Sequence, residues 1–141
     1  MVKLRLDLYN AMTIDLVAVW DVPLQDGIHA VEFEHGTLTG KRVIRVDGKE
    51  ILRKDWMFKL VGDETFIVNK ILCVIKIEPQ GLFNYSYSLI VDGQPLRSFT
   101  ESQSKICCTW LVTLPPDGMY RIVLQKDTLD VWANGQQLEV T

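Results

Sequence analysis

The sequence lacks the features that mark several large classes of protein. No stretch gathers Lys and Arg into a continuous basic surface, and the formal net charge is −3, so we do not expect nucleic acid as a partner. No apolar run approaches the roughly 18 to 20 residues of a membrane-spanning helix. The most apolar stretch, 70–77, has the length of a strand. We therefore expect no membrane insertion either.

Cysteine is also scarce. The chain has three cysteines, Cys73 and the adjacent pair Cys107 and Cys108, and no C-x-x-C pair or nearby histidine completes a metal or redox site. The N-terminal segment carries charges from Lys3 onward in place of the apolar block of a secretory signal. An odd number of cysteines without an export signal fits a reducing compartment. We expect a cytoplasmic protein with inert thiols and no cofactor.

Recognisable catalytic patterns are missing as well. The sequence has no nucleophile elbow, no Gly-rich phosphate loop and no H-E-x-x-H. His29 and His35 are separated by about 20 Å if the chain is extended, too far to share a metal, and we expect both on the surface, with His35 in a turn. Glu32 and Glu34 alternate as a solvated strand face does. The sequence therefore supplies no catalytic and no metal-binding residue, and we expect a non-enzymatic protein.

Asp-Gly and Asn-Gly dipeptides are the strongest positive signal. They tolerate the positive φ of tight hairpin turns, and each interrupts an apolar or alternating run. The five dipeptides are Asp26-Gly27, Asp47-Gly48, Asp92-Gly93, Asp117-Gly118 and Asn134-Gly135. Each predicts a turn, and the hairpins at Asp47-Gly48 and Asp92-Gly93 are the clearest.

Between these turns, apolar and polar side chains alternate with period two. Val31 and Phe33 alternate with acidic residues, and 84–91 continues the pattern with one apolar and one polar face. The run 71–77 is apolar on both faces, which predicts a strand that is covered on both sides or lies near the sheet centre. No segment keeps helical spacing over three turns, and 49–58 is the best candidate for a single helical turn. The prediction is an all-β fold, an antiparallel β-sandwich.

The later part of the chain repeats the beginning. The repeat pairs seven positions in order: Trp20, Val22, Leu24, Asp26, Gly27, Val31 and Phe33 with Trp110, Val112, Leu114, Asp117, Gly118, Ile122 and Leu124. The hairpin at Asp47-Gly48 likewise corresponds to Asn134-Gly135. The first copy continues for about fifty residues beyond its hairpin, whereas the second stops at Thr141. A sheet cannot bury its apolar face alone, which makes the second copy incomplete.

This repeat predicts the domain organisation. We expect an N-terminal extension at 1–11, a complete β-sandwich domain at 12–100, a linker at 101–109 and a truncated second β-sandwich domain of the same type at 110–141. The extension precedes Met12, which is a plausible second start site, and we expect it to be dispensable for stability.

Several long blocks occur in an order that resembles one known family. They are Thr13–Val22, Val31–Thr37, Gly40–Val43, Val46–Glu50, Arg53–Gly62, Tyr120–Leu124 and Asp130–Gly135. These blocks resemble the Fas apoptotic inhibitory molecule family from about Met12 onward. The resemblance implies a cytosolic protein of two similar, non-catalytic β-sandwich domains that inhibits apoptosis triggered by the death receptor Fas. It also implies roles in neurite outgrowth and in limiting protein aggregation. Against the family pattern, 70–81 differs in sequence and length, and the latter half of the second domain is missing.

One short segment has the composition of a protein-binding surface. Trp56 and Phe58 lie between the cations Lys54 and Lys59, and clusters of this kind are common in binding hot spots. The alternative is that Trp56 and Phe58, two residues apart on a strand, both point into the core. We name these four residues as the candidate partner-binding site.

Three kinds of partner remain open from the sequence. The first is a component of apoptosis signalling, bound through sheet surface and loops. The second is an unfolded client protein, bound by a chaperone-like holdase that limits aggregation through exposed apolar surface or open strand edges. The third is a small ligand or glycan on the aromatic side chains, which more often pack in a core. The sequence leaves the oligomeric state undetermined.

Overall fold

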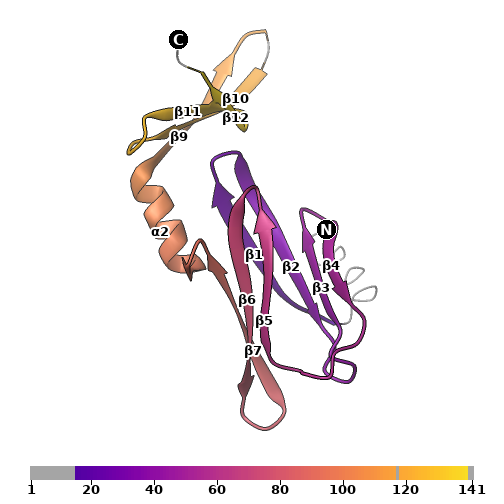
Figure 1. Ribbon diagram of the computed structural model, residues 1–141. Coiled ribbons are helices and arrows are strands. Elements are labelled where there is room, and N and C mark those ends of the chain that lie inside the picture. Colours follow the sequence, from indigo (N-terminus) through magenta and orange to yellow (C-terminus); the bar gives the residue numbers. More distant parts are fainter. Residues whose placement is uncertain (1–14, 117, 140–141) are drawn as a thin grey trace. The chain divides into compact units, whose positions relative to one another are not determined.

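The computed structural model describes residues 15–116 and 118–139 of the chain (Figure 1). These residues divide into two units, which we describe separately. Unit 1 comprises Ala30–Pro95 and the described residues up to Asp21, and unit 2 comprises Val22–His29 and the described residues from Leu96 onward. The described part of the chain forms three antiparallel four-stranded sheets and one short helix, which confirms the predicted all-β class. The predicted extension at 1–11 lies outside the described residues.

The first sheet has the strand order β1-β2-β3-β4, in which each strand pairs with the next one along the chain. Its strands are β1 Leu16–Leu24, β2 Gly27–His35, β3 Arg42–Val46 and β4 Lys49–Lys54. Residues 22–29, the tip of the hairpin between β1 and β2, belong to unit 2. In the segment 49–58, the best candidate for a helical turn, Lys49–Lys54 form β4 instead, because the Asp47-Gly48 turn returns the chain onto β3.

The second sheet also follows chain order, β5-β6-β7-β8, and lies wholly in unit 1. Its strands are β5 Gly62–Val68, β6 Ile71–Gln80, β7 Asn84–Val91 and β8 Gln94–Pro95. The run in β6 was predicted to be covered on both sides or to lie near the sheet centre. Cys73, Ile75 and Ile77 are buried, while Leu72 on the other face is exposed, so only one face is covered. The second alternative is confirmed, because β6 lies inside the sheet between β5 and β7.

The inner faces of these two sheets form the core of unit 1. Val31 and Phe33 of β2 are fully buried, as the alternation predicts, and Phe33 packs edge-on against Tyr87 of β7 with ring centroids 5.8 Å apart. Leu89 and Val91 continue the same face of β7 inward. Unit 1 is therefore a two-layer antiparallel sandwich, and each of its sheets covers the apolar face of the other.

The hairpin turns have the backbone that their sequences predict. Asp47 and Gly48 have φ values of 52° and 81°, and Asp92 and Gly93 have 51° and 79°, the pattern of a type I′ turn. These two hairpins are confirmed. Asn69-Lys70 makes a further turn of this kind, with φ of 45° and 68°, between β5 and β6, which the sequence analysis missed because no glycine marks it.

Unit 2 contains the helix α2 Leu96–Ile106 and the third sheet. The strands of this sheet are β9 Cys107–Leu114, β10 Gly118–Gln125, β11 Asp130–Ala133 and β12 Gln136–Leu138. The sequence analysis expected no such helix. The helix has few apolar residues, with Phe99 as its buried one, so no sustained apolar pattern marks it in the sequence. The linker predicted at 101–109 covers the end of α2 and the start of β9, and the domain boundaries stay predictions.

The sequence repeat corresponds to a repeat of geometry. In the first sheet, Asp47 accepts a hydrogen bond from the amide of Ala30 through its Oδ1 at 2.8 Å and donates its own amide to the Ala30 carbonyl at 2.8 Å. In the third sheet, Asn134 makes the same two bonds with Arg121, both at 2.9 Å. The strand order β9-β10-β11-β12 also matches β1-β2-β3-β4. The two sheets are therefore built on one plan.

Candidate interaction surface

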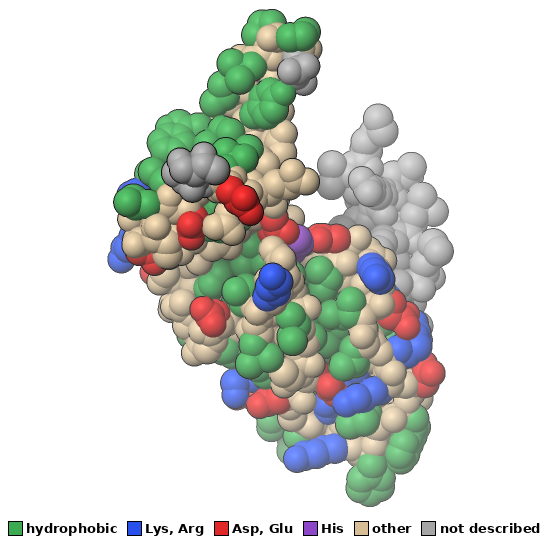
Figure 2. Space-filling model, turned by 45° about the horizontal axis from the view of Figure 1, so that its top comes forward, with side chains coloured by type: hydrophobic (Ala, Val, Ile, Leu, Met, Phe, Trp, Pro, Cys, Tyr) green, Lys and Arg blue, Asp and Glu red, His purple; other side chains and the backbone are tan. Residues whose placement is uncertain are grey.

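Three connections at one end of unit 1 carry exposed apolar side chains. The connections are 36–41 between β2 and β3, 55–61 between β4 and β5, and 81–83 between β6 and β7, and all three lie at the lower end of the sandwich in Figure 1. Large side chains exposed there are Leu38, Trp56, Phe58, Leu82 and Phe83. In Figure 2, hydrophobic side chains gather at this end among Lys, Arg and acidic side chains.

Hydrogen bonds hold the first two of these connections together. The amide of Met57 donates to the carbonyl of Thr39 at 2.9 Å, and the amide of Gly40 donates to the carbonyl of Gly36 at 2.7 Å. Gly40 has a φ of +73°, and a Cβ there would lie 2.2 Å from the Met57 carbonyl oxygen. Only glycine allows this approach of the two chains. The exposed Leu38, Trp56 and Phe58 directly flank the bonded pair Thr39 and Met57.

A buried charge network holds the backbone of the 55–61 connection in place. The guanidinium of Arg42, on the inner face of β3, donates to Glu64 at 2.8 Å and to the carbonyls of Lys59 and Val61 at 2.9 Å each. Glu64 also accepts from the ammonium group of Lys54 at 2.9 and 3.0 Å. Arg42 and Glu64 are both buried, so each charge has a partner at close range, and loss of either partner would leave a buried charge unpaired.

His35 lies beside this network and is not the surface turn residue that the sequence predicted. It is the last residue of β2 and is buried, because its position continues the inward face of Val31 and Phe33. Its Nδ1 lies 2.6 Å from the Tyr87 hydroxyl, and Tyr85 packs edge-on at 5.2 Å. Burial, and then the nearby Arg42 charge, lower the pKa of His35 below its ordinary 6.5, so the neutral ring is favoured.

The expectation of a solvated acidic face is wrong for Glu34. The side chain of Glu34 is buried and forms ion pairs with Arg45 and with Lys41, the latter at 3.2 Å. Lys41 also pairs with Asp15 at 3.0 Å. Period-two alternation assigns Glu34 to the outer face correctly, but it does not show that ion pairs cover that face.

The four residues of the candidate site fall into two groups. Trp56 is 65% exposed and Phe58 is 91% exposed, with ring centroids 6.2 Å apart, so neither aromatic points into the core. The side chain of Lys59 is exposed beside them, while its carbonyl is held by Arg42. Lys54 points away from them to Glu64. The surface therefore consists of the two aromatics and Lys59, and Lys54 supports the loop.

The sequence analysis missed Leu38, Leu82 and Phe83. Leu38 stands alone between two threonines in a segment bounded by Gly36 and Gly40, with no period-two neighbours that would place it in a strand. A hollow of about 270 Å³ lies next to it, lined by Asp15, Gly36, Thr37, Leu38 and Thr39. An isolated apolar residue inside a Gly-bounded loop is the signal that indicates this exposure.

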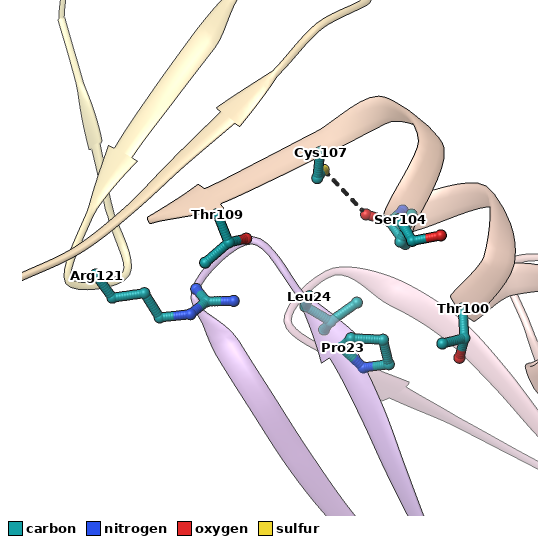
Figure 3. A pocket seen from close by; sticks show the side chains of 8 residues that line it. Pro23, Leu24, Thr100, Ser104, Cys107, Thr109 and Arg121 are labelled. Atoms are coloured by element: carbon teal, nitrogen blue, oxygen red, sulfur yellow. Dashed lines mark hydrogen bonds between the residues drawn. The ribbon is translucent and has the colours of Figure 1, made fainter. Parts of the chain in front are cut away.

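Unit 2 contains a smaller pocket of about 160 Å³ (Figure 3). It is lined by Pro23, Leu24, Thr100, Gln103, Ser104, Cys107, Thr109 and Arg121. The Cys107 thiol donates to Gln103 at 3.4 Å, and the Arg121 guanidinium donates to the Gln25 carbonyl at 2.9 Å. Burial, followed by the charge of Asp127, raises the pKa of the Cys107 thiol, so the reactive thiolate is disfavoured. The pocket offers hydroxyl groups and one guanidinium that is already bonded.

The three cysteines lie among the described residues. Cys73, Cys107 and Cys108 are free, and burial raises the pKa of the Cys73 thiol to about 11. Among residues 15–116 and 118–139, no group of three or more His, Cys, Asp or Glu side chains could hold a metal ion. Over the same residues, no helix has the length and apolar character needed to cross a membrane.

Comparison with known proteins identifies relatives for almost the whole chain. Residues 16–141 match the family model of the Fas apoptotic inhibitory molecule. Fas apoptotic inhibitory molecule 1 of Mus musculus is 54% identical over 127 residues, and that of Homo sapiens is 53% identical; each alignment covers 89% of this chain and 70% of the relative. The Bos taurus protein of the same name is 53% identical, with 63% of its length covered. The chain thus belongs to the Fas apoptotic inhibitory molecule family.

Proposed function

We propose that this protein is a non-enzymatic, cytoplasmic regulator that inhibits apoptosis triggered by Fas, and that it acts by binding another protein of the signalling pathway. Family membership and the names of the mammalian relatives support the link to Fas. The observation that carries the binding mode is the exposed pair Trp56 and Phe58 on a loop whose backbone is fixed.

The chemistry of this surface suits protein binding. Trp56, Phe58 and Leu38 offer apolar area that a partner could remove from water, and aromatic side chains lose little conformational entropy when they bind. The bonds from Arg42 to the carbonyls of Lys59 and Val61 hold the loop before a partner arrives, which reduces the entropy cost of association. Lys59 at the rim favours a partner with an acidic residue beside its apolar anchor.

A double substitution tests this assignment. Trp56→Ala with Phe58→Ala should remove most of the protection that the expressed protein gives to cells treated with Fas ligand, measured as caspase activation. The matched control is Ile67→Ala with Leu72→Ala, an exposed apolar pair that faces each other across β5 and β6 in the same unit. All four side chains are exposed, so both variants should keep the melting temperature of the parent within a few degrees.

The two variants separate the possible outcomes. If the control pair removes protection as strongly as the loop pair, the surface is not specific, and the assignment of Trp56 and Phe58 is wrong. If the loop variant protects cells as well as the parent does, the binding surface lies elsewhere. If the parent itself gives no protection, the link to Fas for this chain fails.

A chaperone-like holdase is the second candidate function. The specific observation in its favour is exposed apolar surface in unit 2, where Trp110, Leu114 and Leu138 are all about half exposed. Such surface binds unfolded clients by the same hydrophobic effect that folds them. The holdase predicts that the chain reduces light scattering from a heated client such as citrate synthase, and that Trp110→Lys weakens this effect while the Trp56 and Phe58 variant does not.

A further inference from the structure

One cross-strand pair at the end of the first sheet contacts the base of the 55–61 connection. His35 is the last residue of β2, Arg42 is the first of β3, and the strand register places them directly opposite each other. Both side chains are buried. The guanidinium of Arg42 donates to the carbonyls of Lys59 and Val61 at 2.9 Å each. The backbone of Leu60, between them, lies close enough to the His35 ring to favour a proton on it, but it forms no hydrogen bond with Nε2.

The surroundings of His35 suit a neutral ring. Its Nδ1 lies 2.6 Å from the Tyr87 hydroxyl, and Tyr85 packs edge-on against the ring with centroids 5.2 Å apart. The Nε2 atom is buried and has no hydrogen-bond partner among the described residues. Both neighbours from β7 are phenols, and burial raises the pKa of Tyr87 above its ordinary 10, so this side chain stays uncharged. A charged imidazole would therefore find no opposite charge on β7.

The carboxylates near His35 are already paired with other cations. The elements packed around the ring contribute Arg42 from β3, Lys54 from β4, Glu64 from β5 and Asp15, which precedes β1. Glu64 is the partner of both Arg42 and Lys54, so two cations share one carboxylate. Asp15 is paired at 3.0 Å with the lysine that precedes Arg42. Among the described residues, a proton on His35 would therefore add a third cation to the network without a carboxylate of its own.

We propose that His35 is a pH-dependent switch for the 55–61 connection: when the ring takes up a proton, Arg42 moves away from it and releases the two carbonyls that it holds. Two buried cations on neighbouring strand ends repel each other strongly, because the protein interior screens charges weakly. Arg42 keeps its charge at every pH at which the protein folds, so only a movement relieves the repulsion. The 55–61 connection lies at the surface, where the guanidinium can exchange the two carbonyls for water.

The switch acts on the segment that carries Trp56 and Phe58. After release of the two carbonyls, the bond from the Met57 amide to the Thr39 carbonyl still holds the other end of the segment. Residues 59–61 therefore become mobile while the sheets stay folded. The consequence for binding rests on the proposed function. A mobile loop loses more entropy on association, so a partner at Trp56 and Phe58 should bind more weakly in acid than at neutral pH.

Nuclear magnetic resonance of the full 141-residue chain tests the switch without any partner. From about pH 7.5 down to about pH 4.5, the imidazole nitrogen shifts report the protonation of His35, and backbone order parameters report the mobility of residues 59–61. These order parameters should be about 0.85 at neutral pH and below about 0.6 once the ring is protonated. Both changes should share one midpoint, which lies below pH 6.5 because the fold favours the neutral ring.

Two histidine variants assign the effect to one side chain. His35→Gln removes the titrating group and keeps a polar side chain that can bond to the Tyr87 hydroxyl, so residues 59–61 should stay ordered down to the lowest pH. His29→Gln is the matched control, because His29 is the other histidine of the chain, pairs with Asp26 at 2.8 Å and belongs to unit 2. In this control, residues 59–61 should lose order at the same pH as in the parent. Far-UV circular dichroism and the melting temperature at neutral pH check that both variants fold.

Any of three results would overturn the proposal. The first is order at residues 59–61 that persists after His35 has taken up its proton. The second is cooperative unfolding of the parent before His35 is protonated; both are seen in the parent alone. The third is an equal loss of order in His35→Gln, which would assign the effect to other groups such as Glu64. The caspase measurement on the Trp56 and Phe58 variant is independent of all three, so failure of the switch and failure of the proposed function are distinguishable.

Discussion

The sheets β1–β4 and β9–β12 share a strand order and a hairpin geometry but differ in what covers them. Phe33 in the first sheet is fully buried, whereas its counterpart in the repeat, Leu124, is only half-buried. Val31 and its counterpart Ile122 differ in the same way. The first sheet packs on β5–β8, and the described residues of unit 2 hold no second sheet. Among the described residues, one sequence pattern therefore gives a closed core in the first sheet and partly exposed apolar residues in the third.

This difference shows what a strand pattern does and does not encode. Alternation and Asp-Gly or Asn-Gly turns specify the hairpins locally, and both copies form them with nearly the same φ values. Burial depends on a second layer, which residues elsewhere in the chain must supply. The stabilisation that the apolar residues provide therefore differs between the copies even where the residue types agree.

The largest predicted difference between the two sheets is in the free energy of unfolding lost when equivalent side chains are truncated to Ala. Phe33→Ala should lower the free energy of unfolding by about 3 to 5 kcal/mol, because it leaves a cavity in a closed core. Leu124→Ala should cost about 1 to 2 kcal/mol, since that side chain is already partly in water. Urea unfolding at 5 µM measures both. Equal losses would show that the third sheet is as well covered as the first.

A second prediction concerns the contact between the two loops of the first sheet. Gly40→Ala should destabilise unit 1 by about 3 kcal/mol, because the new Cβ would lie 2.2 Å from the Met57 carbonyl oxygen. Gly81→Ala is the matched control: its φ of +75° is almost the same, but no atom lies within 4 Å of the new Cβ, so about 1 kcal/mol is expected. A similar cost for both substitutions would refute the close approach of the two loops.

The third prediction compares the repeated hairpins. Gly48→Ala should cost about 1 kcal/mol from its positive φ alone, since nothing lies near its Cβ. Gly135→Ala should cost about 2 kcal/mol, because the added Cβ would lie 3.1 Å from the Asp26 carbonyl oxygen within unit 2. Thermal melts of the two variants compare the sites directly, and a smaller loss at Gly135 would contradict the contact with Asp26.

The smallest predicted effect is a pH dependence of the stability of unit 1. The folded state lowers the pKa of His35 below 6.5, so the unfolded chain takes up a proton first as the pH falls. The stability that the neutral ring contributes is complete above about pH 6.5 and declines as the pH falls below it. Urea unfolding between pH 7.5 and 5.5 should show this decline, and His35→Phe should flatten it. An unchanged slope in the variant would mean that other groups cause it.

Much of the fold could be predicted because its signals are local. The hairpins at Asp47-Gly48 and Asp92-Gly93, the inward faces of β2 and β7, and the all-β class follow from turn chemistry and alternation. The helix α2 could not be predicted, because few apolar residues mark its face and Phe99 alone is buried. The turn at Asn69-Lys70 was missed because it has no glycine.

The site was less predictable because it depends on contacts between distant segments. The sequence indicated Trp56 and Phe58, but it could not show that Arg42 fixes their loop. The guanidinium of Arg42 pairs with Glu64, which lies 22 residues away and also binds Lys54. Burial of His35 depends on Tyr87, 52 residues away. Polar residues that a strand pattern assigns to the surface can thus be covered by a partner that alternation alone does not reveal.

Amide hydrogen exchange tests the contrast between the sandwich of unit 1 and the third sheet most directly. We predict slow exchange in β6, which has a strand on each side and a buried face. In β9 and β12, the edge strands of the third sheet, exchange should be faster by at least a hundredfold. Uniform protection of the whole monomer, with a single cooperative melt, would contradict the account.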